Sequence, residues 1–172
     1  MPGITLCIQY VKHFFEDFVI QLKSKFKQYK MSNNKLFHTS NDAIQFALLI
    51  IRVGFGIIYI LHGFPKIIGG PERWVAVGGA MGFVGLGFAP AFWGLMAALS
   101  EFVGGLLLVL GLYARIAVAF LAFTMLIATI MHISTGDPLG TVLHPVKGLV
   151  VFIALLYSGA GIYALDTRLG NR

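Results

Sequence analysis

The chain contains four apolar segments, each about as long as a bilayer is thick. They cover residues 43–62, 91–112, 116–133 and 146–165. About 20 apolar residues in a helix cross the hydrocarbon core, and only helices or closed barrels satisfy every backbone polar group there. Composition agrees, since 58% of the 172 residues are hydrophobic and 12% are charged, against about one-quarter in soluble domains. The sequence therefore predicts an all-α membrane protein, a four-helix transmembrane bundle.

Two charged residues interrupt the first two of these segments. Arg52 lies near the middle of the first, and Glu101 lies in the second, beside Ser100 and Gly104. An intramembrane charge costs about 2.5–3.5 kcal/mol on insertion scales, so each of the two needs a partner. Because the two segments run in opposite directions, we predict that Arg52 and Glu101 reach a similar depth and form a buried ion pair. A structural role for this pair and a catalytic or transport role for Glu101 both remain open.

Residues 1–42 differ from the rest of the chain and predict an amphipathic, basic N-terminal extension. Ile8, Val11 and Phe15 follow helical spacing, and the basic strip KSKFKQYK comes after them. This pattern is typical of an interfacial helix that binds anionic lipid. An alternative is that the natural start is Met31, because MSNNKLFHTSND resembles a polar N-terminus. The single cysteine, Cys7, argues against a disulfide framework or a cysteine-rich metal site.

Positive charge predicts the orientation of the bundle in the membrane. Most lysines and arginines outside the spans lie before the first span, in the turn after the second, or in the tail at residues 167–172; they are Lys12, Lys23, Lys25, Lys27, Lys30, Lys35, Arg115, Arg168 and Arg172. Cytoplasmic loops carry such an excess, so both termini of the membrane domain at residues 43–166 are expected in the cytoplasm. A charge excess confined to the membrane surface makes nucleic acid a poor candidate partner.

Two connecting segments carry helix-breaking residues. The first span is expected to end where Pro65 and the sequence GGP at residues 69–71 break the helix. Residues 71–90 are apolar but rich in glycine, which predicts a surface-lying or re-entrant helix. Residues 134–145 contain turn residues and are expected to form a loop, so that the fourth span starts at Pro145.

A cluster of polar residues is expected at the outer membrane face. Its members are Tyr59, His62, Lys66, His132, His144 and Lys147. Histidines at helix ends are used as proton carriers or metal ligands, but their spacing here predicts no metal site. A quinone site is a second interpretation, with Lys66 and His62 as the polar mouth of a pocket between the first, second and fourth spans. Residues 74–90 would then cover it, and the tail would lie along residues 54–56. In the third interpretation, His62 and Lys66 bind no ligand and are ordinary interfacial residues whose polar ends reach water.

The paired motifs resemble those of the DoxX family. The segments LLIIRVGFGIIYILHGFPKIIGG and ALSEFVGGLLLVLGLYARIAVAF carry the matching residues, which are Arg52, His62, Gly63, Lys66, Glu101, Gly104, Gly105, Gly111 and Arg115. The resemblance covers about residues 44–166. It implies a small four-helix protein of the bacterial cytoplasmic membrane and an association with quinone-linked redox enzymes.

Two classes of function follow from the sequence. One is a membrane subunit or partner of a redox system in respiratory, sulfur or oxidative-stress chemistry, with quinone as the candidate cofactor. The other is a non-catalytic scaffold, assembly factor or small transporter. The sequence holds no nucleophile triad, phosphate-binding loop or dinucleotide fingerprint, so an enzymatic role would be that of an accessory subunit.

Overall fold

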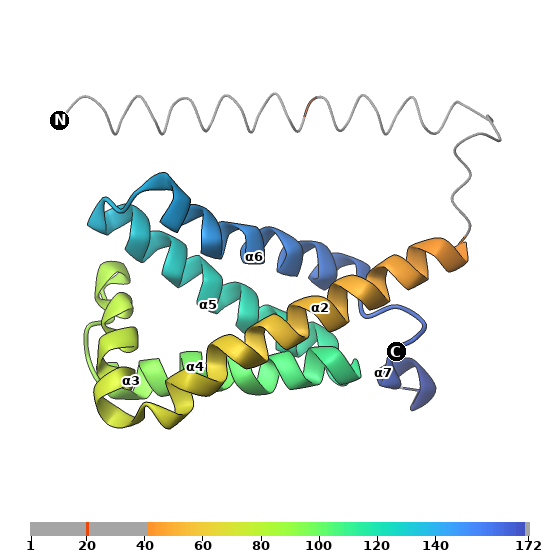
Figure 1. Cartoon of the computed structure of the whole chain (residues 1–172), viewed down its shortest axis with the longest axis horizontal. Helices are drawn as coiled ribbons and strands as arrows, with labels where there is room; N and C mark the ends of the chain where they lie inside the picture. The colour runs from red at the N-terminus through yellow and green to blue at the C-terminus, as the bar shows by residue number, and fades with distance from the viewer. Residues whose placement is uncertain (1–19, 21–40, 171–172) are drawn as a thin grey trace. The chain divides into compact units, whose positions relative to one another are not determined.

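The computed structural model describes residue 20 and residues 41–170, and Figure 1 shows them as helices joined by short turns. The long helices are α2 (Asn41–Ile68), α4 (Pro90–Leu110), α5 (Ala114–Thr135) and α6 (Leu139–Ser158), each long and apolar enough to cross a membrane. Shorter elements are α3 (Gly70–Gly78), the 3-10 helix η2 (Gly79–Val84) and α7 (Leu165–Arg168). The predicted all-α, four-helix membrane fold is confirmed. The predicted N-terminal extension lies almost wholly outside the described residues.

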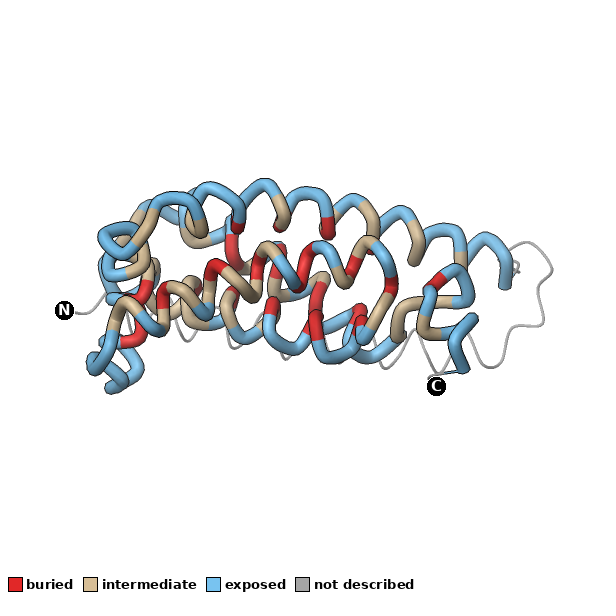
Figure 2. The backbone as a smooth tube through the Cα atoms, turned by 90° about the horizontal axis from the view of Figure 1, so that it is seen from below, coloured by how far each residue is buried: buried red, intermediate tan, exposed pale blue. Residues whose placement is uncertain are grey.

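The helices bury small faces against one another and leave large apolar faces exposed. Figure 2 shows the buried positions on the sides of the helices that face one another. Tyr59, Leu121 and Phe152 belong to the core cluster, where the rings of Tyr59 and Phe152 meet edge to face at 4.8 Å. Phe120 and Ile153, in contrast, are more than half exposed. An apolar exterior of this extent is stable in lipid and not in water.

Close glycine contacts hold α2 antiparallel to α4. A methyl group added at Gly56 would lie 2.9 Å from the carbonyl oxygen of Gly105, and one added at Gly105 would lie 2.8 Å from that of Gly56. Further along, Gly63 faces the backbone of Phe102. Small residues let membrane helices approach at backbone distance, where van der Waals packing replaces the hydrophobic effect. At Gly56 these contacts take up part of the groove at residues 54–56 in which we expected a ligand tail, while Gly54 has no atom within 4 Å of an added methyl group.

The first and fourth spans have different ends from those predicted. Helix α2 continues through Pro65 to Ile68, where the amide of Gly69 donates to the Pro65 carbonyl and the indole of Trp74 donates to the Lys66 carbonyl. These bonds satisfy carbonyls at the helix end, so the break falls at Gly70, whose φ is +70°. Helix α6 starts at Leu139, inside the expected loop, because the Pro138 carbonyl accepts from two amides of its first turn.

The residues after α6 fold back onto the bundle as a C-terminal clasp (residues 159–168). The buried guanidinium of Arg52 donates to the carbonyls of Ala160 and Tyr163, at 3.0 and 3.1 Å. The carboxylate of Asp166 accepts from the amides of Tyr113 and Ala114 at the start of α5. Asp166 therefore caps α5, in keeping with the preference for negative charge at a helix N-terminus.

Candidate ligand pocket

Glu101 is 1% exposed, and its ion-pair partner is Lys66. The Lys66 ammonium lies 2.6 Å from each carboxylate oxygen. Arg52 is buried as well, but its guanidinium binds the carbonyls of the clasp. The prediction that Arg52 and Glu101 pair with each other was therefore wrong, while both residues are buried as the sequence indicated.

The register of α2 against α4 explains this exchange of partners. Arg52 lies against Gly111, the residue that ends α4. Glu101 is ten residues earlier in α4, which corresponds to about 15 Å along the helix. Because α2 continues through Pro65, Lys66 is carried to the level of Glu101.

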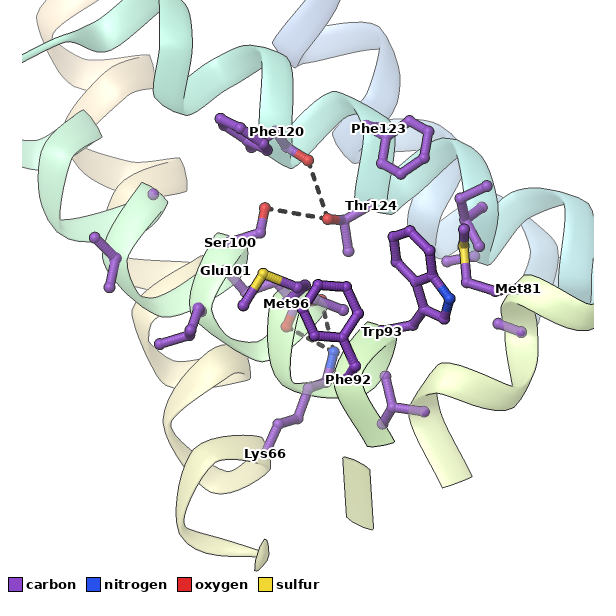
Figure 3. Close-up of a pocket in the computed structure, with 18 of the residues that line it drawn as sticks. Lys66, Met81, Phe92, Trp93, Met96, Ser100, Glu101, Phe120, Phe123 and Thr124 are labelled. Atoms are coloured by element: carbon purple, nitrogen blue, oxygen red, sulfur yellow. Dashed lines mark hydrogen bonds and ion pairs between the residues drawn. The ribbon is translucent and has the colours of Figure 1, made fainter. Parts of the chain in front are cut away.

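A pocket of about 960 Å³ lies beside this ion pair, between α3 and η2 on one side and α4 and α5 on the other. Figure 3 shows Phe92, Trp93 and Met96 of α4 facing Phe120 and Phe123 of α5 across it. Phe92 and Phe120 are more than half exposed. Both α4 and α5 are long and apolar enough to cross a membrane.

Polar groups occupy one strip of the apolar wall. The Lys66–Glu101 pair forms part of it, and the hydroxyl of Thr124 lies 3.1 Å from that of Ser100 (Figure 3). A lysine ammonium carries three hydrogens. Two of them suffice for the carboxylate oxygens, which leaves one for a further acceptor. The pocket thus combines an aromatic surface with a hydrogen-bond donor.

His132 and Asp137 form a polar pair at the end of α5, where His132 also lines the pocket. The Nδ1 atom of His132 lies 2.6 Å from Oδ2 of Asp137, and the hydroxyl of Thr135 donates to the same oxygen. Gly136, with φ +74°, ends the helix, and the amide of Asp137 donates back to the His132 carbonyl. Hydrogen bonds from His132 and then Thr135 hold the pKa of Asp137 below its ordinary value.

The other predicted mouth residues lie away from this pocket. Tyr59 is buried in the core, and the ring of His62 lies 6.0 Å from it on the same helix. His144 and Lys147 are exposed on α6. Of the six predicted residues, Lys66 and His132 line the pocket. In the part of the chain that the structure describes, no group of three metal-ligating side chains is brought together.

The sequence analysis missed two features of the site. It treated Asp137 as part of a plain loop. A glycine that ends a helix, followed directly by an aspartate, can turn the carboxylate back toward a histidine in the last turn of that helix. Gly136, Asp137 and His132 form this pattern. It also placed the pocket between the first, second and fourth spans, whereas the lining comes mainly from the second and third, with Lys66 contributed by the first. Residues 71–84 do lie over the pocket as α3 and η2, but they do so against α4 and α5.

The fold and the site define a class, namely a small integral membrane protein with four spans and an apolar pocket beside a buried ion pair. The DoxX family model matches residues 47–133, about half of the chain. The chain belongs to the DoxX family.

Two curated relatives show the range of this similarity. Inner membrane protein YphA of Escherichia coli K12 is 32% identical over 131 residues, covering 70% of this chain and 89% of that protein. A Bacillus subtilis protein bearing the name "Putative oxidoreductase CatD" is 31% identical over 127 residues, covering 73% and 89%. No solved structure matches this chain.

Proposed function

We propose that this protein binds a tailed quinone in the pocket between α3, η2, α4 and α5, and serves as a membrane partner of a redox enzyme. The observation that carries the proposal is the Lys66–Glu101 pair in the wall of an aromatic pocket. Ligand sites are typically apolar cavities of about 300–1,000 Å³ with a few placed polar groups. The pocket has this size and this character.

The chemistry of the lining favours an oxygenated ring with an apolar tail. Phe92, Phe120 and Phe123 offer faces and edges against which a ring can stack. The remaining hydrogen of Lys66 suits a ring carbonyl, and charge-assisted bonds of this kind are about twice as strong as neutral ones. The exposed side of the pocket faces lipid, so a tail would leave it into the bilayer.

The cellular setting is part of the same proposal. Two relatives from Escherichia coli are inner membrane proteins by name, and the charge pattern favours cytoplasmic termini. We place this protein in a bacterial cytoplasmic membrane with both termini inside. The name of the CatD relative is in keeping with a redox partner.

Binding of decyl-tailed benzoquinone and naphthoquinone to the purified protein in lipid nanodiscs tests the pocket. Ala128 lines the pocket, so Ala128→Phe fills space that the ring needs and should weaken binding by about tenfold or more. Ile153→Phe, which adds bulk at an exposed position of α6 outside the lining, is the control and should bind like the wild type.

Two results would overturn this proposal. One is a wild-type protein that binds neither quinone, and the other is equal binding by wild type and Ala128→Phe. Either would favour the alternative of a non-catalytic scaffold, assembly factor or transporter, in which the buried pair contributes to stability alone.

A further inference from the structure

One face of α5 carries a regular series of residues along the pocket. Phe120, Thr124, Ala128 and His132 are spaced four apart, so they lie above one another on the same side of the helix, and all of them line the pocket. Ala128 has the smallest side chain of the four. The small side chain of Ala128 therefore leaves space in the pocket between the hydroxyl of Thr124 and the imidazole of His132.

The spacing of these polar groups matches a 1,4-dioxygenated ring. Thr124 and His132 are eight residues apart, or about 12 Å along the helix. The two oxygens of such a ring are about 5 Å apart, and a hydrogen bond of about 2.8 Å at each end gives about 11 Å in total. At the Thr124 end, Ser100 lies within hydrogen-bond distance and is followed in the chain by Glu101, the partner of Lys66.

The two ends differ in hydrogen-bonding character. Lys66 can only donate. At the other end Asp137 accepts from Nδ1 of His132, which leaves Nε2 of a neutral imidazole as an acceptor. A carboxylate that orients a histidine in this way is the arrangement of a proton-accepting pair.

The charged surroundings of His132 are defined by the elements packed near it. Arg73 of α3 lines the same pocket, as do Lys66 and Glu101, while Asp137 is the group in direct contact with the imidazole. Helix α6 contributes His144 and Lys147, which are exposed and outside the lining.

We propose that His132, oriented by Asp137, holds one ring oxygen of the bound head group and selects between its reduced and oxidised forms. This inference rests on the proposed function. Neutral His132 accepts a hydrogen bond from a ring hydroxyl and so favours the quinol. His132 is thus a specificity-determining contact, and the other oxygen lies toward the end of the pocket formed by Thr124 and Ser100.

Affinities of a decyl-tailed benzoquinol and benzoquinone, measured without oxygen in nanodiscs, test this inference. The ratio of quinol to quinone affinity should be about fivefold higher in the wild type than in His132→Leu, the worth of one hydrogen bond. Asp137→Asn should reduce this preference for the quinol, and His144→Leu, outside the pocket, should keep it.

The outcomes separate this inference from the proposed function. Suppose that Ala128→Phe blocks quinone binding but His132→Leu keeps the wild-type ratio of quinol to quinone affinity. That result overturns the role of His132 alone. Absence of binding by either form overturns both. Thermal unfolding of each variant identifies any loss of binding that comes from misfolding.

Discussion

At the scale of single residues, Arg52 and Glu101 hold different parts of the molecule. Arg52 fastens the C-terminal clasp to α2, and Glu101 fastens α4 to the end of α2 through Lys66. Both side chains are buried. The partner of each charge depends on where another segment of the chain lies. For Arg52 this is the clasp, and for Glu101 it is the last turn of α2.

Replacing Arg52 with methionine should lower the free energy of unfolding by about 2–4 kcal/mol, because two charge-assisted hydrogen bonds to carbonyls are lost. Thermal or denaturant unfolding in detergent measures this loss. The matched control is Lys147→Met on α6, whose exposed side chain should change stability by about 0.5 kcal/mol or less. Equal effects of the two substitutions would show that the clasp contacts contribute nothing.

A double-mutant cycle tests the partner of Glu101. Glu101→Gln should destabilise by about 3 kcal/mol because Lys66 loses its counter-ion, and adding Lys66→Met should restore part of the loss. The pair Glu101→Gln and Arg52→Met should be additive, since their separation is about 15 Å. Coupling between Arg52 and Glu101 instead would contradict the register of α2 and α4.

Trp93 offers a different kind of test. Its indole nitrogen is buried without a hydrogen-bond partner among the described residues. Trp93→Phe removes this unsatisfied donor and keeps most of the ring, so unfolding should be unchanged or shifted up by about 1 kcal/mol. A loss of several kcal/mol would mean that the indole nitrogen has a partner beyond the described residues.

The four spans and the burial of Arg52 and Glu101 could be predicted from the sequence. The partner of Glu101 could not, for a physical reason. Long apolar runs identify spans because lipid leaves the backbone few choices. The partner of Glu101 depended on whether Pro65 ends a helix, and that was decided by the bond from Trp74 to the Lys66 carbonyl. No local pattern around residue 65 contains that bond, since its donor lies in the next helix.

At the scale of elements, the crossing of α3 over α4 is set by two glycines. A methyl group at Gly78 would overlap the carbonyl of Pro90, and one at Gly94 would overlap the carbonyl of Trp74. These contacts are with backbone, which cannot rotate away. The crossing determines where η2 lies and therefore where the pocket ends.

Neighbouring glycines make this a controlled experiment. Gly78→Ala should destabilise by about 2–3 kcal/mol through overpacking, because α3 must move off α4. Gly79→Ala meets no atom within 4 Å and should be neutral or slightly stabilising. If unfolding temperatures of the two variants coincide, the α3–α4 contact is looser than the structure describes.

The turn between α5 and α6 predicts a dependence on acid. Because hydrogen bonds lower the pKa of Asp137 in the folded protein, its contribution to stability is present above the ordinary aspartate pKa of about 4 and is lost as pH falls below that. Acid unfolding of Asp137→Asn, which lacks this ionisation, should therefore be less steep below about pH 4. An unchanged acid transition would show that the His132–Asp137 pair does not contribute to the free energy of unfolding.

At the scale of the whole molecule, four spanning helices and the charge pattern give a topology that reporters can read. Fusions after Gly140, in the first turn of α6, should report the periplasm, and fusions at Arg172 should report the cytoplasm. Truncation before residue 40 is the control for the basic N-terminal segment. A periplasmic C-terminus would move the His132 end of the pocket to the cytoplasmic face.

The clasp also has a consequence for biogenesis. Arg52 donates to the carbonyls of Ala160 and Tyr163, which lie 108 and 111 positions further along the chain. At about 5–20 residues per second, a ribosome needs roughly 5–20 s to make that stretch. During this time the first span holds an arginine that has not met its final partners. We therefore expect α2 to stay at the insertion machinery or at the membrane surface until the last residues emerge, and chains that end before residue 160 to be recognised as unfinished and degraded.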